Sequence, residues 1–414
     1  MKKFMHNFSE AFLKEFRLVI KDPGLLVFFI LLPLAYPIVY SLIYNPEVVR
    51  EVPVVVVDSD RSPLSRELVR RLDACQGTRI KGYAANLQEA KRAMHEHDAY
   101  GILQIPEGFE KKIGNNEQGN VVLFCEMSLM LRYKALLVSA TDIMLDLGGS
   151  ITTEKIDLIA PEAATISSGD LMPVENVALG NIESGFDSFV MPGILILILQ
   201  QVVMLAIGMA GGAMREYPLN ADFNPATGKP GCLATMPARI LAYLVIMAIP
   251  TIYIIVIVPI IFRFPMSGNF LAELLFLLPM LLSSIALGFI LQGIVRERES
   301  VFVIWVVTSV VFLFLSGLTW PRYAFPPVWT FISDLVPATW GVEGFVKMNT
   351  NGSSIAQVSD CYINLWIQSA VYIFFAYLSQ KFIQRPAIMR AYEEQLQSAA
   401  IADNASSKAD NTRC

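Results

Sequence analysis

The sequence has few of the residues that build metal centres or carry charge. It contains only five cysteines and three histidines and has no CxxC pair, which argues against a metal site. Charged residues make up 17% of the chain, below the roughly 25% of a typical soluble domain. A single globular cytosolic enzyme and a strongly basic nucleic-acid binder are therefore both excluded, and no nucleic-acid partner is expected.

The chain also lacks a nucleotide-binding motif. The nearest feature is Thr227-Gly228-Lys229-Pro230, but Phe223 stands where the upstream glycine is required, and Pro230 replaces the Ser or Thr that would hold magnesium. There is no Ser-His-Asp order, GxSxG elbow or HExxH. We expect no catalytic, metal or cofactor-binding residue here. If ATP supplies energy, another polypeptide hydrolyses it.

Long apolar runs are what the sequence has in excess. A helix needs about 20 apolar residues to cross the ~30 Å hydrocarbon core of a bilayer. Six segments are long enough: 24–44, and about 188–213, 238–262, 270–294, 301–318 and 361–383. The amphipathic residues 1–23 predict a helix along the inner leaflet, with a flexible tail as the alternative. The predicted fold class is an α-helical integral membrane protein with six transmembrane helices, five of them within 186–383.

Lysine and arginine set the predicted orientation. With the N-terminus inside, the cytosolic flanks collect fifteen of these residues and the short outer loops collect three. This asymmetry predicts that both termini are cytosolic. We expect a multi-pass protein of a bacterial inner membrane, in contact with the lipid bilayer, with residues 384–414 forming a partly disordered cytosolic tail.

Residues 45–185 differ from the rest of the chain. They hold 14 basic and 21 acidic side chains, a net charge of −7, while the remainder has a net charge of +2. Strand and helix patterns alternate from Pro53 to Glu126, and the pattern beyond Met130 is helical. Because the stretch follows the first span, it predicts an inserted extracytosolic (periplasmic) α/β domain.

Three polar features of this domain have plain structural interpretations. His95 and His97 lack a third convergent ligand and would point in different directions on a helix. Asp58 and Asp60 lie in a strand-to-helix turn and are expected to cap the following helix. Cys75 and Cys125 either form a disulfide outside the cytosol or remain two separate thiols.

The six spans contain no ionisable residue near their midplane, which argues against an ion-coupled transporter. Gly208 and Gly212 form a GxxxG pattern that allows close helix contact. That contact is either within the chain or between two copies, and the sequence leaves both open.

Residues 315–348 are too polar and proline-rich for one span and too apolar for a free loop. They predict two short re-entrant helices at about 320–345, broken near Pro326-Pro327 and Pro337. Trp320, Trp329 and Trp340 would anchor them at the interface.

This run resembles the signature of ABC type-2 exporter permeases. The matching residues are Ser316-Gly317, Trp320-Pro321, Pro326-Pro327 and Pro337-Ala338-Thr339. The segment DAYGILQIPEGFEKKI, residues 98–113, is similar to an element of family members that carry a large outer domain. The resemblance implies that the signature residues Ser316, Gly317, Trp320, Pro321, Pro326, Pro327, Pro337 and Thr339 form an outer gate.

The resemblance further implies a half-transporter that pairs as a homodimer or with a related permease and binds separate cytosolic ATPase subunits, where ATP and Mg act. The coupling loop would be 214–237, beginning Arg215-Glu216-Tyr217, although this loop departs from the family pattern. Arg296 and Glu297 either add ATPase contacts or belong to a solvated charged turn.

The function expected from these features is ATP-driven export of an apolar or amphipathic, drug- or lipid-like substrate. A periplasmic membrane-fusion adaptor and an outer-membrane channel are possible further partners. The alternative is a non-transporting receptor or adhesion module that the spans anchor.

Overall fold

The computed structural model describes residues 2–44, 48–159, 185–216, 232–264 and 266–411. It is mostly helical, with six helices long and apolar enough to cross a membrane and one small mixed sheet. The chain divides into two units, Met1–Asn45 with Ala178–Cys414, and Pro46–Val177. We call the first the helix bundle and the second the α/β unit, and describe each by itself.

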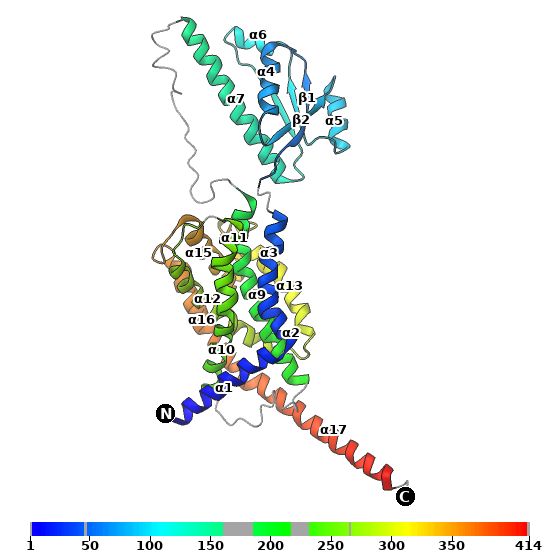
Figure 1. Ribbon diagram of the computed structural model, residues 1–414, viewed down its shortest axis with the longest axis vertical. Coiled ribbons are helices and arrows are strands. Elements are labelled where there is room, and N and C mark those ends of the chain that lie inside the picture. The colour runs from blue at the N-terminus through cyan, green and yellow to red at the C-terminus, as the bar shows by residue number, and fades with distance from the viewer. Residues whose placement is uncertain (1, 45–47, 160–184, 217–231, 265, 412–414) are drawn as a thin grey trace. The chain divides into compact units, whose positions relative to one another are not determined.

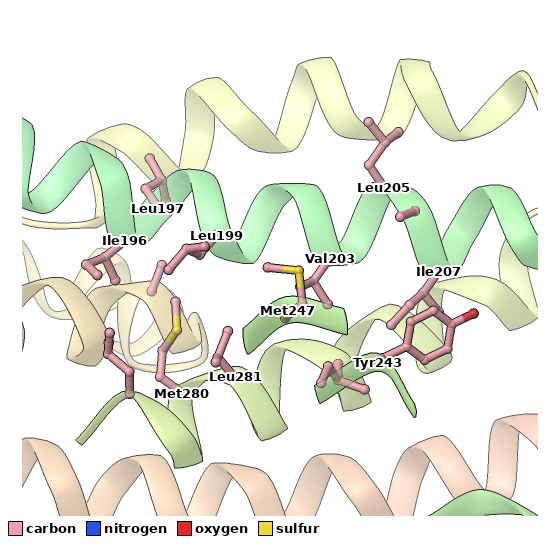
Figure 2. Packing of buried hydrophobic residues seen from close by; sticks show 14 of the residues in the cluster. Ile196, Leu197, Leu199, Val203, Leu205, Ile207, Tyr243, Met247, Met280 and Leu281 are labelled. Carbon is pink, nitrogen blue, oxygen red and sulfur yellow. The ribbon is translucent and has the colours of Figure 1, made fainter. Parts of the chain in front are cut away.

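The helix bundle is built around α9, Phe186–Glu216, most of which is buried. Side chains of α9 such as Ile196, Val203 and Ile207 pack with Tyr243 and Met280 of neighbouring helices (Figure 2). The other elements are α1 Lys2–Lys21, α2 Pro23–Leu26, η1 Val27–Leu31, α3 Leu32–Tyr44, α10 Cys232–Ile252, η2 Tyr253–Ile257, α11 Val258–Phe262, α12 Phe270–Ile294, α13 Ser300–Leu315, η3 Arg322–Ala324, α14 Pro327–Asp334, α15 Pro337–Asn351, α16 Ser359–Ser379, η4 Gln380–Gln384 and α17 Arg385–Asn411.

The helices match five of the six predicted spans closely. The fifth expected span, 301–318, is shorter than predicted: α13 ends at Leu315, because Gly317 has a φ of 85° that does not continue a helix. Its 16 residues extend about 24 Å. Along α13, valines such as Val303 and Val307 are exposed, as befits a lipid-facing surface.

Helices form both at the start of the bundle, in residues 2–21, and at its end, in α17. Residues 2–21 form a helix, and Asp22 ends it by capping α2. Within residues 384–414, which the sequence predicts to be a partly disordered tail, α17 continues to Asn411. Alanine, glutamine and glutamate have high helix propensity, and α17 follows η4 without a break.

The α/β unit has a four-stranded sheet in the order β2-β1-β3-β4. The strands are β1 Val52–Asp58, β2 Thr78–Tyr83, β3 Gly101–Ile105 and β4 Val122–Cys125. β1 is parallel to β2 and β3, and β4 is antiparallel to β3. β1 is a central strand, so its valine run is buried on both faces of the sheet.

Helices cover both faces of this sheet. α4 Pro63–Asp73, α6 Phe109–Gly114 and α7 Met130–Ile159 pack with Val54 and Leu103, while α5 Leu87–His95 packs with Val55 and Ile102. The Met130–Lys155 portion of α7 is one of the six helices apolar enough to span a membrane. It was not among the six predicted spans, and it buries residues such as Leu136 and Ile143 in this soluble-type core.

The acidic turn after β1 contacts the starts of two helices, α4 and α6. Ser62 caps α4 through the Ser65 N–H at 3.1 Å, and Asp58 accepts from backbone N–H groups of its own turn. Asp60 instead accepts from the N–H of Gly108 at 2.8 Å and of Glu110 at 3.1 Å, so it caps α6. Neither Asp58 nor Asp60 caps the following helix, so that expectation is wrong.

The two cysteines of this unit are separate free thiols. Burial raises the pKa of both Cys75 and Cys125. His95 is exposed near the end of α5. Within the described residues, no group of three or more His, Cys, Asp and Glu side chains is placed to hold a metal ion.

Candidate functional site

The bundle has polar contacts concentrated at its two ends. We call them the α1 end, where α1 and α17 lie, and the α15 end, where α15 lies (Figure 1). At the α1 end, Glu15 of α1 is almost fully buried and pairs with Arg239 of α10, with Nη2 and Oε1 2.9 Å apart. The Tyr243 hydroxyl donates to the same carboxylate oxygen at 2.8 Å. A buried pair of this kind fixes α1 against α10.

A chain of amides extends this pair across the bundle. Arg239 donates to Gln380 at 2.8 Å, and Gln380 donates to Gln292 of α12 at 2.8 Å. Gln292 in turn donates to the carbonyl oxygen of Ile207 on α9 at 3.3 Å. The Arg239 guanidinium also lies over the Phe289 ring, 4.6 Å from its centroid. One cluster therefore connects α1, α9, α10, α12 and η4.

A second ion pair lies at the same end. Asp22, between α1 and α2, accepts from Arg298 in the turn between α12 and α13 at 2.7 Å. Gly24 lies so close that an added Cβ would meet the Arg298 guanidinium at 2.3 Å. The turn after α12 is thus fastened to the start of the first span.

Of the predicted coupling residues, Arg215 faces inward. Its Nε donates to Gln384 at 2.9 Å and its Nη2 to the carbonyl oxygen of Gly293 at 2.8 Å. Glu216 is half-buried, and its carbonyl oxygen accepts from Gln395 of α17 at 2.8 Å. Tyr217 lies outside the described residues. Arg296 and Glu297, by contrast, are exposed in the turn between α12 and α13.

The GxxxG pattern packs within the chain. A Cβ added to Gly208 would meet the Val301 side chain at 2.9 Å, and one added to Gly212 would meet the Arg298 backbone nitrogen at 2.6 Å. Gly208 therefore lets α9 approach α13 closely, and Gly212 lets it approach the turn before α13. Both glycines therefore make close contacts within the chain.

At the α15 end, the signature residues meet at the end of α13. The carbonyl oxygen of Leu315 accepts from the hydroxyls of Ser333 at 3.0 Å and Thr339 at 3.3 Å. Ser316 is buried, and its hydroxyl donates to Leu313 at 2.7 Å. Pro337 begins α15, and the N–H of Ala338 donates to the Gln200 side chain of α9 at 2.6 Å. Gln200 thus caps α15 from the central helix.

Arg322 organises the neighbouring segment. Its guanidinium donates to Asp334 and Glu343 and lies over the Trp340 ring, 4.1 Å from its centroid. Lys347 adds a second contact to Glu343 at 2.8 Å. These contacts connect η3, α14 and α15 into one folded segment.

The remaining signature residues border this segment. α14 begins at Pro327 and α15 at Pro337, at the prolines where the sequence predicts the breaks. Gly317 is half-buried, whereas Trp320, Pro321, Pro326 and Pro327 are exposed. The structure therefore divides the signature into buried residues that join helices, and exposed residues on the surface.

Unpartnered polar groups lie between α9 and α13. Both amide atoms of Gln201 and the Trp305 indole N–H are buried without a hydrogen-bond partner in the described part of the chain. With Thr308, they line a void of about 10 Å³, room for about one water. These groups can hydrogen-bond a polar atom inside an otherwise apolar bundle.

Sequence reasoning missed the Glu15–Arg239 pair and Gln200. Arg239 is one of the fifteen lysines and arginines of the predicted cytosolic flanks. One signal was available, because Glu15 falls on the apolar stripe of the amphipathic N-terminal helix. A carboxylate on a buried stripe requires a cationic partner.

Comparison with known proteins identifies the family of this chain. No curated protein matches this sequence. Residues 23–378 match the family described as ABC-2 family transporter protein. The match runs from the start of the first span almost to the end of α16, and covers both units. The chain belongs to the ABC-2 transporter family and is a transmembrane permease subunit rather than an ATPase.

Proposed function

We propose that this chain is the permease subunit of an ATP-driven exporter, powered by a separate ATPase subunit. Membership of the ABC-2 family over residues 23–378 is the observation that carries the proposal. Two copies, or one copy and a related permease, would enclose the transport path. Both termini would be cytosolic in a bacterial inner membrane, and the α/β unit would lie outside. The location of α1 and α17 at one end of the bundle supports termini on one side.

The polar cluster at the α1 end supports a route for coupling. Exposed Arg296 and Glu297 are the side chains we assign to ATPase contact, and neighbouring Arg298 pairs with Asp22 at 2.7 Å. A displacement of this turn would move the start of the first span directly. Arg215, whose guanidinium connects α9, α12 and η4, would carry the same displacement inward. ATP binding then shifts the population between two arrangements of the spans.

We assign the outer gate to the α15 end of the bundle and the substrate path to the space between α9 and α13. The segment from Ser316 to Thr339, held by Arg322, would form the outer gate. The path would run between α9 and α13, where Gln201, Trp305 and Thr308 offer hydrogen bonds in an apolar wall. Such a wall suits an apolar or amphipathic drug- or lipid-like substrate. The α/β unit would receive a periplasmic adaptor leading to an outer-membrane channel.

Co-purification and coupling test this proposal together. A tagged copy from native membranes should bring an ATPase subunit with it, and the complex should show substrate-stimulated ATP hydrolysis. Reversing the exposed charges with Arg296→Glu and Glu297→Arg should abolish that stimulation while membrane insertion is kept. Lys81→Ala in the α/β unit is the control and should leave it unchanged. Absence of any ATPase subunit, or stimulation that survives the charge reversal, would contradict the corresponding assignment.

A further inference from the structure

The α/β unit contains a pocket of about 500 Å³ beside the core that α4, α6 and α7 form. Its walls are mainly apolar, with side chains of Leu68, Phe109, Ile113, Met144, Leu147 and Ile151. Small-molecule sites have volumes of about 300–1,000 Å³ and mostly apolar walls with a few polar groups. The pocket has the size and lining of such a site.

The pocket exists because α7 is longer than the sheet that it covers. α7 has 30 residues and extends about 45 Å, whereas β1 has seven residues and extends about 23 Å. The last part of α7 faces α6 and residues 115–121 instead of strands. Gly148 contributes no side chain there, and an added Cβ would meet no atom within 4 Å.

One end of the pocket holds the cationic Lys155, and the exposed, anionic Glu117 also lines the pocket. The Lys155 ammonium donates to the carbonyl oxygen of Ile113 and, at 2.8 Å, to the side-chain oxygen of Asn116. An ammonium has three N–H donors, so one remains for a further acceptor. Both of these acceptors are oxygens of uncharged groups. Thr152 and exposed Glu117 complete the polar lining at this end, with Thr152 donating to Gly148 at 2.8 Å.

We propose that this pocket binds a single-chain amphiphile with one anionic head group, such as a long-chain carboxylate. Its apolar body would be removed from water by the six apolar side chains. Its head group would accept from Lys155, a charge-assisted hydrogen bond of the stronger kind. Because three helices, α4, α6 and α7, and a connecting segment line the site, it fits a small molecule better than a helix laid along one surface. The proposal does not depend on the transport activity.

Photolabelling locates the ligand directly. The full chain in lipid nanodiscs is exposed to a diazirine-bearing palmitate, and adducts are mapped by mass spectrometry. We expect adducts within 109–121 and 144–155 that excess palmitate suppresses. Gly148→Leu should fill the pocket and reduce these adducts at least about tenfold, the effect of roughly 1.4 kcal/mol. Gly82→Leu is the matched control, because a Cβ there also meets no atom within 4 Å, and should label as wild type does.

The head group is tested separately. Lys155→Gln should lower palmitate labelling about tenfold, as expected for loss of a charged hydrogen bond. Lys155→Arg should retain it, and a diazirine-bearing hexadecanol should be indifferent to both changes. Adducts confined to the helix bundle, or unaffected by Gly148→Leu, would overturn the site. Equal labelling of Lys155→Gln and wild type would overturn the anionic head group.

Discussion

Among the described residues, the helix bundle contains ion pairs that are more buried than any in the α/β unit. In the helix bundle, the side chains of Arg239 and Glu15 are 15% and 6% exposed. In the α/β unit, Arg79 and Glu51 are each 69% exposed, at 3.4 Å. Exposed pairs contribute about 0–1 kcal/mol because water and salt screen them. Buried charges, in contrast, strongly destabilise a fold when one partner is lost. The bundle should therefore depend on individual charged residues, and the α/β unit on its apolar core.

Arg239→Ala should produce the largest effect. It leaves Glu15 buried without its cation and should lower the free energy of unfolding by about 3–5 kcal/mol. Thermal unfolding of the chain in nanodiscs measures the change, followed by tryptophan fluorescence for the bundle, where all five tryptophans lie, and by hydrogen exchange for the α/β unit. Replacing both residues, Glu15→Ala with Arg239→Ala, should recover part of the loss, because no unpaired charge remains. Lys81→Ala, which breaks the exposed pair with Asp98 at 2.6 Å, should cost less than about 1 kcal/mol. Equal losses of stability for Arg239→Ala and Lys81→Ala would contradict this difference between the two units.

Leu103→Ala should produce the next effect, in the other unit. Leu103 is fully buried on β3, and removing such a side chain costs about 2–5 kcal/mol. Hydrogen exchange should accelerate in β1, β3 and α4 and stay unchanged in α9 and α12, because the two units have separate cores. Faster exchange in α9 would show instead that the units unfold together.

Two glycines should respond in opposite directions. Gly212→Ala places a Cβ 2.6 Å from the Arg298 backbone nitrogen, and such overpacking costs about 1–3 kcal/mol. Gly148→Ala adds a Cβ in open space on α7 and should stabilise the helix by about 0.5–1 kcal/mol. The unfolding temperatures of the two variants measure both effects. A stabilised Gly212→Ala variant would contradict the close packing of α9 on the turn before α13.

Asp60→Asn should produce the smallest effect, and one that depends on pH. The hydrogen bond from the Ser62 side chain lowers the pKa of Asp60 most, and the N–H groups of Glu110 and Gly108 add to it. Because the pKa is lowered in the folded state, the ionised carboxylate stabilises the fold at pH values above the usual aspartate pKa of about 3.9. This stabilisation is lost as the pH falls below that value. At pH 7 the variant should lose about 0.5–2 kcal/mol, as for a helix cap. Denaturant unfolding of the α/β unit, repeated from pH 7 to pH 2.5, should show the difference from wild type disappear at low pH.

Much of the helix layout could be predicted because it is a local property. Apolar runs located five spans within a few residues, and Pro327 and Pro337 marked the starts of α14 and α15. Strand and helix patterns predicted the α/β unit for the same reason. The span predicted at 301–318 is a helix too, but it ends three residues early, at Leu315, because of the backbone conformation at Gly317.

The candidate site was predictable only where it lies in one continuous segment. All residues of the signature from Ser316 to Thr339 could be identified in the sequence, because they lie in one segment. The Arg239–Glu15 pair was not, because its partners are 224 positions apart. Arg215 was expected to face an ATPase but turns inward to Gln384, 169 positions away. Only packing decides which distant acceptor a long side chain reaches.

The sequence by itself determined the class of the protein: apolar runs that require a bilayer, an acidic stretch that folds as a separate unit, and a signature that points to one family. Tertiary structure alone decided how its few buried polar groups are used. It paired Glu15 with Arg239, capped α15 with Gln200, capped α6 with Asp60, and left a pocket beside Gly148. The reason is physical. Hydropathy and propensity act between neighbours along the chain, whereas a buried polar group must find its partner wherever the fold brings one.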